Sequence, residues 1–88
     1  MSTLHIFTKP VSQYNANMLE NLIKAEDNIL LVSDACYCSK QFRQFSAQLH
    51  LLAEDASARG IAVHDNDIVI DYTAFVDLTL TSNNTISW

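Results

Sequence analysis

The sequence predicts a single α/β domain, a mostly parallel sheet of four to five strands with helices on both faces. Three observations lead to this fold class. The chain has 88 residues, enough for one domain and no more. Short apolar runs alternate with segments whose apolar residues recur at helical spacing. Residues 29–32 are continuously apolar, as a strand covered on both faces of a parallel sheet requires.

The first half of the chain predicts two strands, each followed by a helical segment. Residues 4–7 are apolar and Pro10 follows them, which indicates a buried first strand and a loop. Ser12 is placed to cap a helix that reaches about Ala25. The apolar stripe of this helix is Tyr14, Met18, Leu19, Leu22 and Ile23. After the strand at residues 29–32, Asp34 offers an N-cap for a short helix or turn.

The second half predicts two further strands with helices and an edge strand. Phe42 and Phe45 keep an apolar side through residues 39–47, and residues 49–52 form the third strand. Asp55 is placed to cap a short helix that Gly60 ends. Residues 68–70 form the fourth strand, and Asp71 caps the next helix. One face of that helix carries Tyr72, Phe75, Val76 and Thr79. Residues 82–84 form a turn before a β-prone segment at residues 85–88.

Composition and charge disfavour several classes of function. Ten acidic residues against five basic ones give a net charge of −5, which argues against direct binding of tRNA or DNA. No apolar run approaches the roughly 20 residues that span a bilayer, and no signal peptide is apparent. We therefore expect a cytoplasmic protein without membrane contact. The single glycine excludes glycine-rich nucleotide-binding motifs and a G-x-S-x-G nucleophile elbow.

Cys36 and Cys38 are the most conspicuous candidates for chemistry. They follow a predicted buried strand, at the sheet edge where α/β proteins place their sites. Their spacing is not that of a C-x-x-C redox motif, and two cysteines cannot close a zinc site. We favour reduced thiols that fill apolar space. A reactive or accessory sulfur site at Cys36 or Cys38 is the alternative.

The remaining polar candidates have structural interpretations. His5 and His50 lie in strand patterns and His64 in a polar loop, without the spacing of metal ligands. The carboxylate pairs Glu54/Asp55 and Asp65/Asp67 suit helix caps and loops better than acid/base catalysis. We expect no catalytic residue, no metal and no cofactor.

One segment resembles a known family. Residues 71–79 read D-Y-T-A-F-V-D-L-T and resemble the D-Y-x-x-F-V-x-L-T run of the TusB/DsrH family. Further matches in the same order are Leu4-His5, Pro10, Asp34-x-x-Tyr37, the run from Leu52 through Asp55 to Ala58-Arg59-Gly60, and Trp88. The similarity spans residues 1–88 as one TusB/DsrH-like domain.

The resemblance implies a DsrE-like, flavodoxin-like α/β fold and a place in a sulfur-relay complex. The partners would be C-type and D-type subunits, in a heterohexamer with two copies of each of the three chains. A cysteine of the D-type subunit would carry persulfide sulfur to a downstream carrier, for 2-thiolation of the tRNA wobble uridine. Family members from sulfur-oxidising bacteria have a cysteine in the first helix. Residues 12–25 here contain none, which favours the tRNA branch.

These observations predict an assembly subunit that is not catalytic by itself. The alternatives are a carrier that uses Cys36 or Cys38, and a binding module unrelated to sulfur. We expect the subunit interface in residues 71–88, where Tyr72, Phe75 and Trp88 concentrate aromatic area. Packing of these side chains against the chain's own sheet is the competing interpretation.

Overall fold

The computed structural model describes residues 2–45, 48–64 and 66–88, and its strands form one five-stranded sheet. The strands are β1 (Thr3–Phe7), β2 (Asn28–Leu31), β3 (Gln48–Leu52), β4 (Ile68–Ile70) and β5 (Asn84–Ser87). Their order is β4-β3-β2-β1-β5, and each neighbouring pair is parallel. The predicted α/β class and the predicted edge position of the last strand are therefore confirmed.

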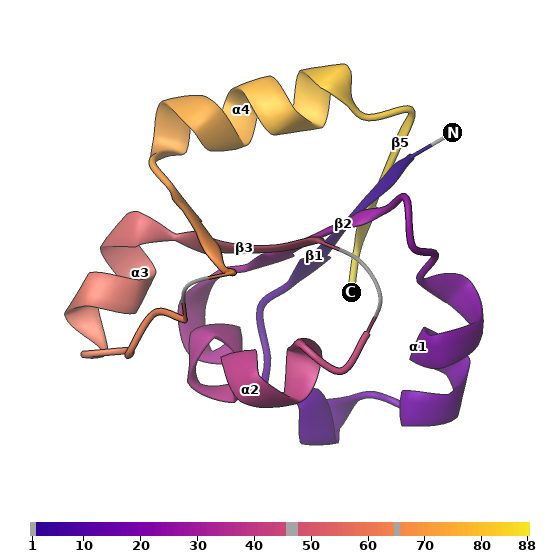
Figure 1. Cartoon of the computed structure of the whole chain (residues 1–88), viewed down its shortest axis with the longest axis horizontal. Coiled ribbons are helices and arrows are strands. Elements are labelled where there is room, and N and C mark those ends of the chain that lie inside the picture. The colour runs from indigo at the N-terminus through magenta and orange to yellow at the C-terminus, as the bar shows by residue number, and fades with distance from the viewer. Residues whose placement is uncertain (1, 46–47, 65) are drawn as a thin grey trace.

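The helices cover the two faces of the sheet unequally. They are η1 (Val11–Gln13), α1 (Ala16–Leu22), η2 (Ser33–Cys38), α2 (Ser39–Phe42), α3 (Ala53–Ala58) and α4 (Tyr72–Thr81). Figure 1 shows α4 alone above the sheet, while α1 and α2 lie below it with α3 beside them. Helices on both faces were predicted. None of the helices in the described residues has the length and hydropathy needed to cross a bilayer.

Alternation along the strands separates two apolar clusters. In β1, Phe7 faces α1, α2 and α3, whereas Leu4 and Ile6 face α4. We call the first cluster the main core; its buried members are Phe7, Leu19, Ile23, Ile29, Leu31, Ala35, Cys36, Phe42, Leu49, Leu51 and Ala56. The second, the α4-side core, has only Leu4, Ile6 and Leu30 as buried members. Phe75 and Leu78 of α4 pack against this second cluster.

The first helix is shorter than predicted. The cap is Asn15, whose side chain accepts from the N–H of Met18 at 3.2 Å, and not Ser12. Ser12 lies in η1, and Tyr14 is extended between the two helices. Leu19 and Ile23 face the main core, but Met18 and Leu22 are 43% and 46% exposed. Only part of the predicted stripe is therefore buried.

Two further predicted N-caps are wrong, and the fourth is confirmed. Neither η2 nor α3 has a side-chain cap, since their N-cap residues are Val32 and Leu52. Asp34 and Asp55 lie within the first turns of these helices and bind other partners. Asp71 does cap α4, accepting from the N–H of Ala74 at 2.8 Å.

Gly60 ends α3 as predicted. Its φ is +62°, the left-handed conformation that glycine adopts without steric cost. The N–H of Gly60 donates to the carbonyl of Ser57, and that of Ile61 to the carbonyl of Ala56. These two bonds form a Schellman motif.

The apolar sides of α2 and α4 differ in part from those predicted from the sequence. Phe42 is buried and Phe45 partly buried, while residues 46–47 of the predicted segment lie outside the described residues. In α4, Phe75 faces the sheet together with Leu78 rather than with Thr79. Tyr72 and Val76 point away from the core.

Candidate functional site

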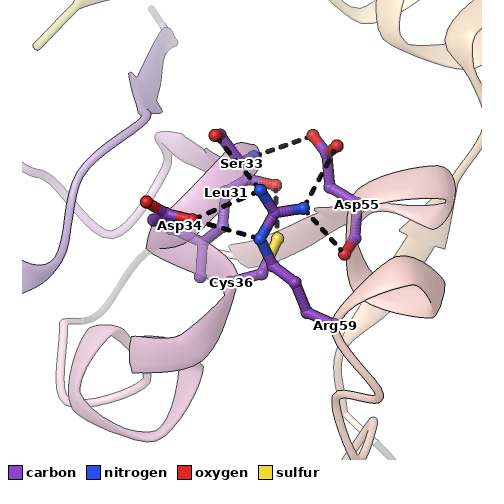
Figure 2. A network of polar contacts seen from close by, with 6 residues as sticks. All are labelled: Leu31, Ser33, Asp34, Cys36, Asp55 and Arg59. Atoms are coloured by element: carbon purple, nitrogen blue, oxygen red, sulfur yellow. Dashed lines mark hydrogen bonds and ion pairs between the residues drawn. The ribbon is translucent and has the colours of Figure 1, made fainter.

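A polar cluster lies where β2 ends and α3 begins (Figure 2). β2 passes into η2 through Ser33, whose φ of +54° is rare for a residue other than glycine. The N–H of Ser33 donates to Oδ2 of Asp55 at 2.7 Å. This hydrogen bond fixes the turn after β2 to the first turn of α3. We call Ser33, Asp34, Asp55 and Arg59 the Arg59 cluster.

The guanidinium of Arg59 joins the other members of the cluster. Its Nε and Nη2 donate to Oδ1 of Asp34 at 3.3 and 3.2 Å, and Nη2 also donates to Oγ of Ser33 at 3.4 Å. Its Nη1 donates to the carbonyl of Asp55 at 3.3 Å and lies 3.6 Å from Oδ1 of the same residue. Tyr37 lies beneath it, with 5.9 Å between Cζ of Arg59 and the centroid of the Tyr37 ring. Two carboxylates thus neutralise the one cation, which leaves it poorly suited to bind an anionic ligand.

Cys36 lies beside this cluster and is buried in the main core. Its Sγ donates to the carbonyl of Leu31 at 3.4 Å. Burial, reinforced by the negative charge of Asp55, raises the pKa of the Cys36 thiol to about 11. Because the thiolate is the nucleophile, a thiol that stays protonated at neutral pH reacts slowly. Cys38 is half-buried, packs against the same core and is also a free thiol.

The other polar candidates do not converge on a catalytic arrangement. No group of three or more His, Cys, Asp or Glu side chains that could hold a metal occurs among the described residues. His64 is exposed, and its backbone N–H donates to Asp67. Asp67 also accepts from Nε of Arg43 at 2.8 Å, and this bond holds its pKa below the ordinary value. Asp65 lies outside the described residues.

A second polar network is buried beside β1, and no sequence pattern predicted it. Asp27 accepts from the N–H groups of Thr3 and Lys24 at 3.0 and 2.9 Å, and Nε2 of His5 lies 2.9 Å from its Oδ2. Burial alone would raise the pKa of Asp27, but these hydrogen bonds outweigh it and lower the pKa. The indole N–H of Trp88 donates to Nδ1 of His5 at 3.2 Å. Because the indole N–H can only donate, Nδ1 of His5 is the acceptor of this hydrogen bond. The N–H of His5 is then at Nε2, and it donates a hydrogen bond to Asp27.

The three predicted interface residues lie in different surroundings. Tyr72 is 63% exposed. Phe75 is partly buried in the α4-side core and meets the Tyr72 ring edge-on at 5.8 Å between centroids. Trp88 is partly buried on the opposite face, stacked on Phe7 with 5.8 Å between ring centroids and 2° between planes. The structure therefore does not bring these three side chains into one patch.

Comparisons of this sequence with known proteins point to one protein family. A family model described as "DsrH like protein" matches residues 9–85. Protein TusB of Yersinia pestis (strain Pestoides F) is 33% identical over 94 residues, covering 94% of this chain and 99% of that protein. Protein TusB of Yersinia pseudotuberculosis (strain IP32953) gives the same values.

Two solved structures share the fold. The crystal structure of the ychN protein from E. coli superposes with a TM-score of 0.68 at 16% identity, covering 100% of both chains. The solution NMR structure of protein Tm0979 from Thermotoga maritima gives a TM-score of 0.63 at 24% identity, covering 88% of this chain and 91% of that one. The expected DsrE-like α/β fold is confirmed.

Proposed function

Because the chain belongs to the DsrH-like protein family, we propose that it is a non-catalytic assembly subunit of a sulfur-relay complex for tRNA 2-thiolation. The observation that carries the proposal is the similarity to proteins named TusB over 94% of the chain. Its partners are a C-type and a D-type subunit, two copies of each chain forming a heterohexamer. The persulfide is carried by the D-type subunit and passes to a downstream carrier.

The environment of the cysteines supports a role without sulfur transfer. Cys36 is fully buried, and the raised pKa of its thiol keeps it protonated at neutral pH. Its neighbour Arg59, the cation that would stabilise a thiolate, is already paired with Asp34 and Asp55. The first helix, α1, contains no cysteine. The relay cysteine therefore belongs to a partner.

The charge distribution supports the proposal that tRNA is bound elsewhere in the pathway. The net charge is −5. Two of the five basic residues, Arg43 and Arg59, are engaged in ion pairs with aspartates. Phosphate contacts need clustered free cations, which this pattern does not favour. A cytoplasmic location stays a prediction.

The subunit contact is proposed to involve residues 71–88. Tyr72 contributes the largest exposed aromatic surface of this segment. Phe75 and Trp88 are mostly packed against the chain's own cores, so each reaches a partner only through its exposed edge. Tyrosine and tryptophan are the residues most often enriched at the energetic centres of interfaces.

The proposal is tested by the native mass of the complex. The tagged chain is co-expressed with the C-type and D-type subunits of its own genome, purified and measured by native mass spectrometry. We expect a heterohexamer that contains all three chains. A chain that elutes free of both subunits, although all three are expressed and folded, contradicts the proposal.

A second experiment separates the assembly subunit from a thiol carrier. We expect the double variant Cys36→Ser, Cys38→Ser to leave 2-thiouridine in cellular tRNA nearly unchanged. The buried hydroxyl at position 36 costs about 1–3 kcal/mol of stability at most. The single variant Cys38→Ser is the control, since Cys38 is only half-buried. Loss of thiolated tRNA at normal protein level, together with persulfide labelling of the isolated wild-type chain, would favour the carrier.

A further inference from the structure

The α4 side of the sheet is incompletely covered by the chain itself. Five strands spaced by about 4.8 Å make a surface about 19 Å across between the outer strands. One helix with its side chains is about 10–12 Å wide. Of the helices in the described residues, α4 alone lies on this face, as Figure 1 shows. The face thus presents apolar groups that no second helix in the described residues covers.

The outward side of α4 carries a line of apolar residues. Tyr72, Val76 and Leu80 are each four residues apart, so they lie along one side of the helix. Their side chains are 63%, 39% and 77% exposed. Phe75 and Leu78, on a different side of the same helix, hold α4 on the sheet. The helix is therefore apolar on two sides, and only one of them is used within the chain.

The sheet itself has an exposed apolar residue on the α4 side. The register pairs Ile68 with His50, and His50 with Leu30, so Ile68 lies on the face that α4 covers. It is 40% exposed. The edge strand β4 is therefore not fully covered by α4.

The charged residues on α4 itself are all acidic. Asp71 and Asp77 are the charged residues of α4 and its cap, and both are exposed. The sequence contains no Lys or Arg after Arg59. The exposed side of α1 differs, because Glu20 and Lys24 place both signs of charge near Met18 and Leu22. The α4 surface thus has an apolar centre, and the charged residues that the helix and its cap place at its rim are acidic.

We propose that Tyr72, Val76 and Leu80 form the docking surface for a different subunit, one with an apolar contact area rimmed by Lys or Arg. Complementary charge at the rim steers association and rejects wrong partners. A second copy of this chain fits poorly, because a two-fold contact through α4 would bring the same acidic rim against itself. The inference rests on the proposed heteromeric complex and names the face that assembles it.

The test compares substitutions on the two faces of the folded chain. Tagged wild type, Leu80→Ala, Asp77→Lys and the matched control Leu22→Ala are each co-expressed with the untagged C-type and D-type subunits. Affinity for the captured subunits is then measured by titration. We expect Leu80→Ala and Asp77→Lys to weaken binding by roughly tenfold or more, and Leu22→Ala to leave it unchanged. Leu80 is 77% exposed, so circular dichroism should show an intact fold.

The other possible results each contradict a different claim: the docking surface, the proposed function or the identity of the partner. If wild type captures its partners and the two α4 variants bind equally well, this docking surface is wrong and the proposed function stands. If wild type captures neither subunit, the proposed function fails and the assigned partner fails with it. If the isolated wild-type chain dimerises and Leu80→Ala dissociates the dimer, the occupant is a second copy and the heteromeric assignment is overturned.

Discussion

The two faces of the sheet are built from the same strands, but helices cover them to different extents. On the main-core face, three α-helices enclose a cluster of eleven buried residues, among them Phe7 and Phe42, whose rings lie 4.7 Å apart. On the other face a single helix covers three, Leu4, Ile6 and Leu30. The main-core face holds most of the buried apolar residues. On the other face the outer side of α4 leaves Tyr72, Val76 and Leu80 exposed, and this is the surface on which we propose that a partner docks.

The largest effect is expected from a matched pair of substitutions on β2. Leu30 and Leu31 are adjacent and both fully buried, but they face opposite sides of the sheet. Leu31→Ala should cost about 4 kcal/mol, because the enclosed main core cannot collapse around the cavity. Leu30→Ala should cost about 2–3 kcal/mol, since a single helix can settle toward the sheet.

Urea unfolding of both variants measures this difference, and Leu31→Val with Leu30→Val gives the same comparison where the alanine variants do not fold. Equal losses of unfolding free energy, or a greater loss at Leu30, would contradict the unequal helical coverage of the two faces.

A smaller effect is expected at Trp88, which belongs to the main-core face. Trp88→Phe keeps an aromatic ring on Phe7 but removes the indole N–H that binds Nδ1 of His5, at a cost of about 1 kcal/mol. Trp88→Ala also loses the stacked area and should cost about 2–3 kcal/mol. Thermal unfolding measures both. If Trp88→Ala leaves stability unchanged but abolishes capture of the partner subunits, Trp88 is an interface anchor and the assignment of docking to α4 is weakened.

The smallest effect concerns the pH dependence contributed by His50, a polar residue under α4. Burial lowers the pKa of His50 below its ordinary 6.5. The unfolded chain therefore binds a proton near pH 6.5 that the folded chain does not, and this contribution to stability falls as pH drops below 6.5. His50→Asn retains a donor for the carbonyl of Ile29 without titrating, so its stability should fall less between pH 7 and pH 5. Identical pH profiles for His50→Asn and wild type would refute this contribution.

Much of the fold could be predicted because the decisive signals are local. A continuously apolar run such as residues 29–32 fits a strand covered on both faces, and Gly60 supplies the left-handed residue that ends α3. Asp71 directly precedes an apolar helix, and it caps that helix as predicted. Where neighbouring residues determine the outcome, the sequence is sufficient.

Apart from the cap of α1, where the nearby Asn15 takes the place of Ser12, the errors occur where a distant partner competes with the local signal. Asp34 and Asp55 are suitable caps, but Arg59 and the backbone of Ser33 bind them instead. Asp27 lies within a polar stretch of the sequence, yet it is buried beside β1, because the parallel register aligns Leu4 with Asn28. No pattern within a few residues encodes such contacts. The burial of Cys36 was expected from its apolar setting, whereas the raised pKa of its thiol depends also on Asp55, nineteen positions along the chain.

The direct test of the central claim is amide hydrogen exchange, measured on the isolated chain and on the chain bound to its partner subunits. The two segments to compare are α4 (Tyr72–Thr81) and α1 (Ala16–Leu22), one from each face of the sheet. We predict that exchange slows in α4 on assembly and stays the same in α1, because the partner completes the α4 face. Protection that appears in α1 while α4 exchanges at its free rate would contradict the account.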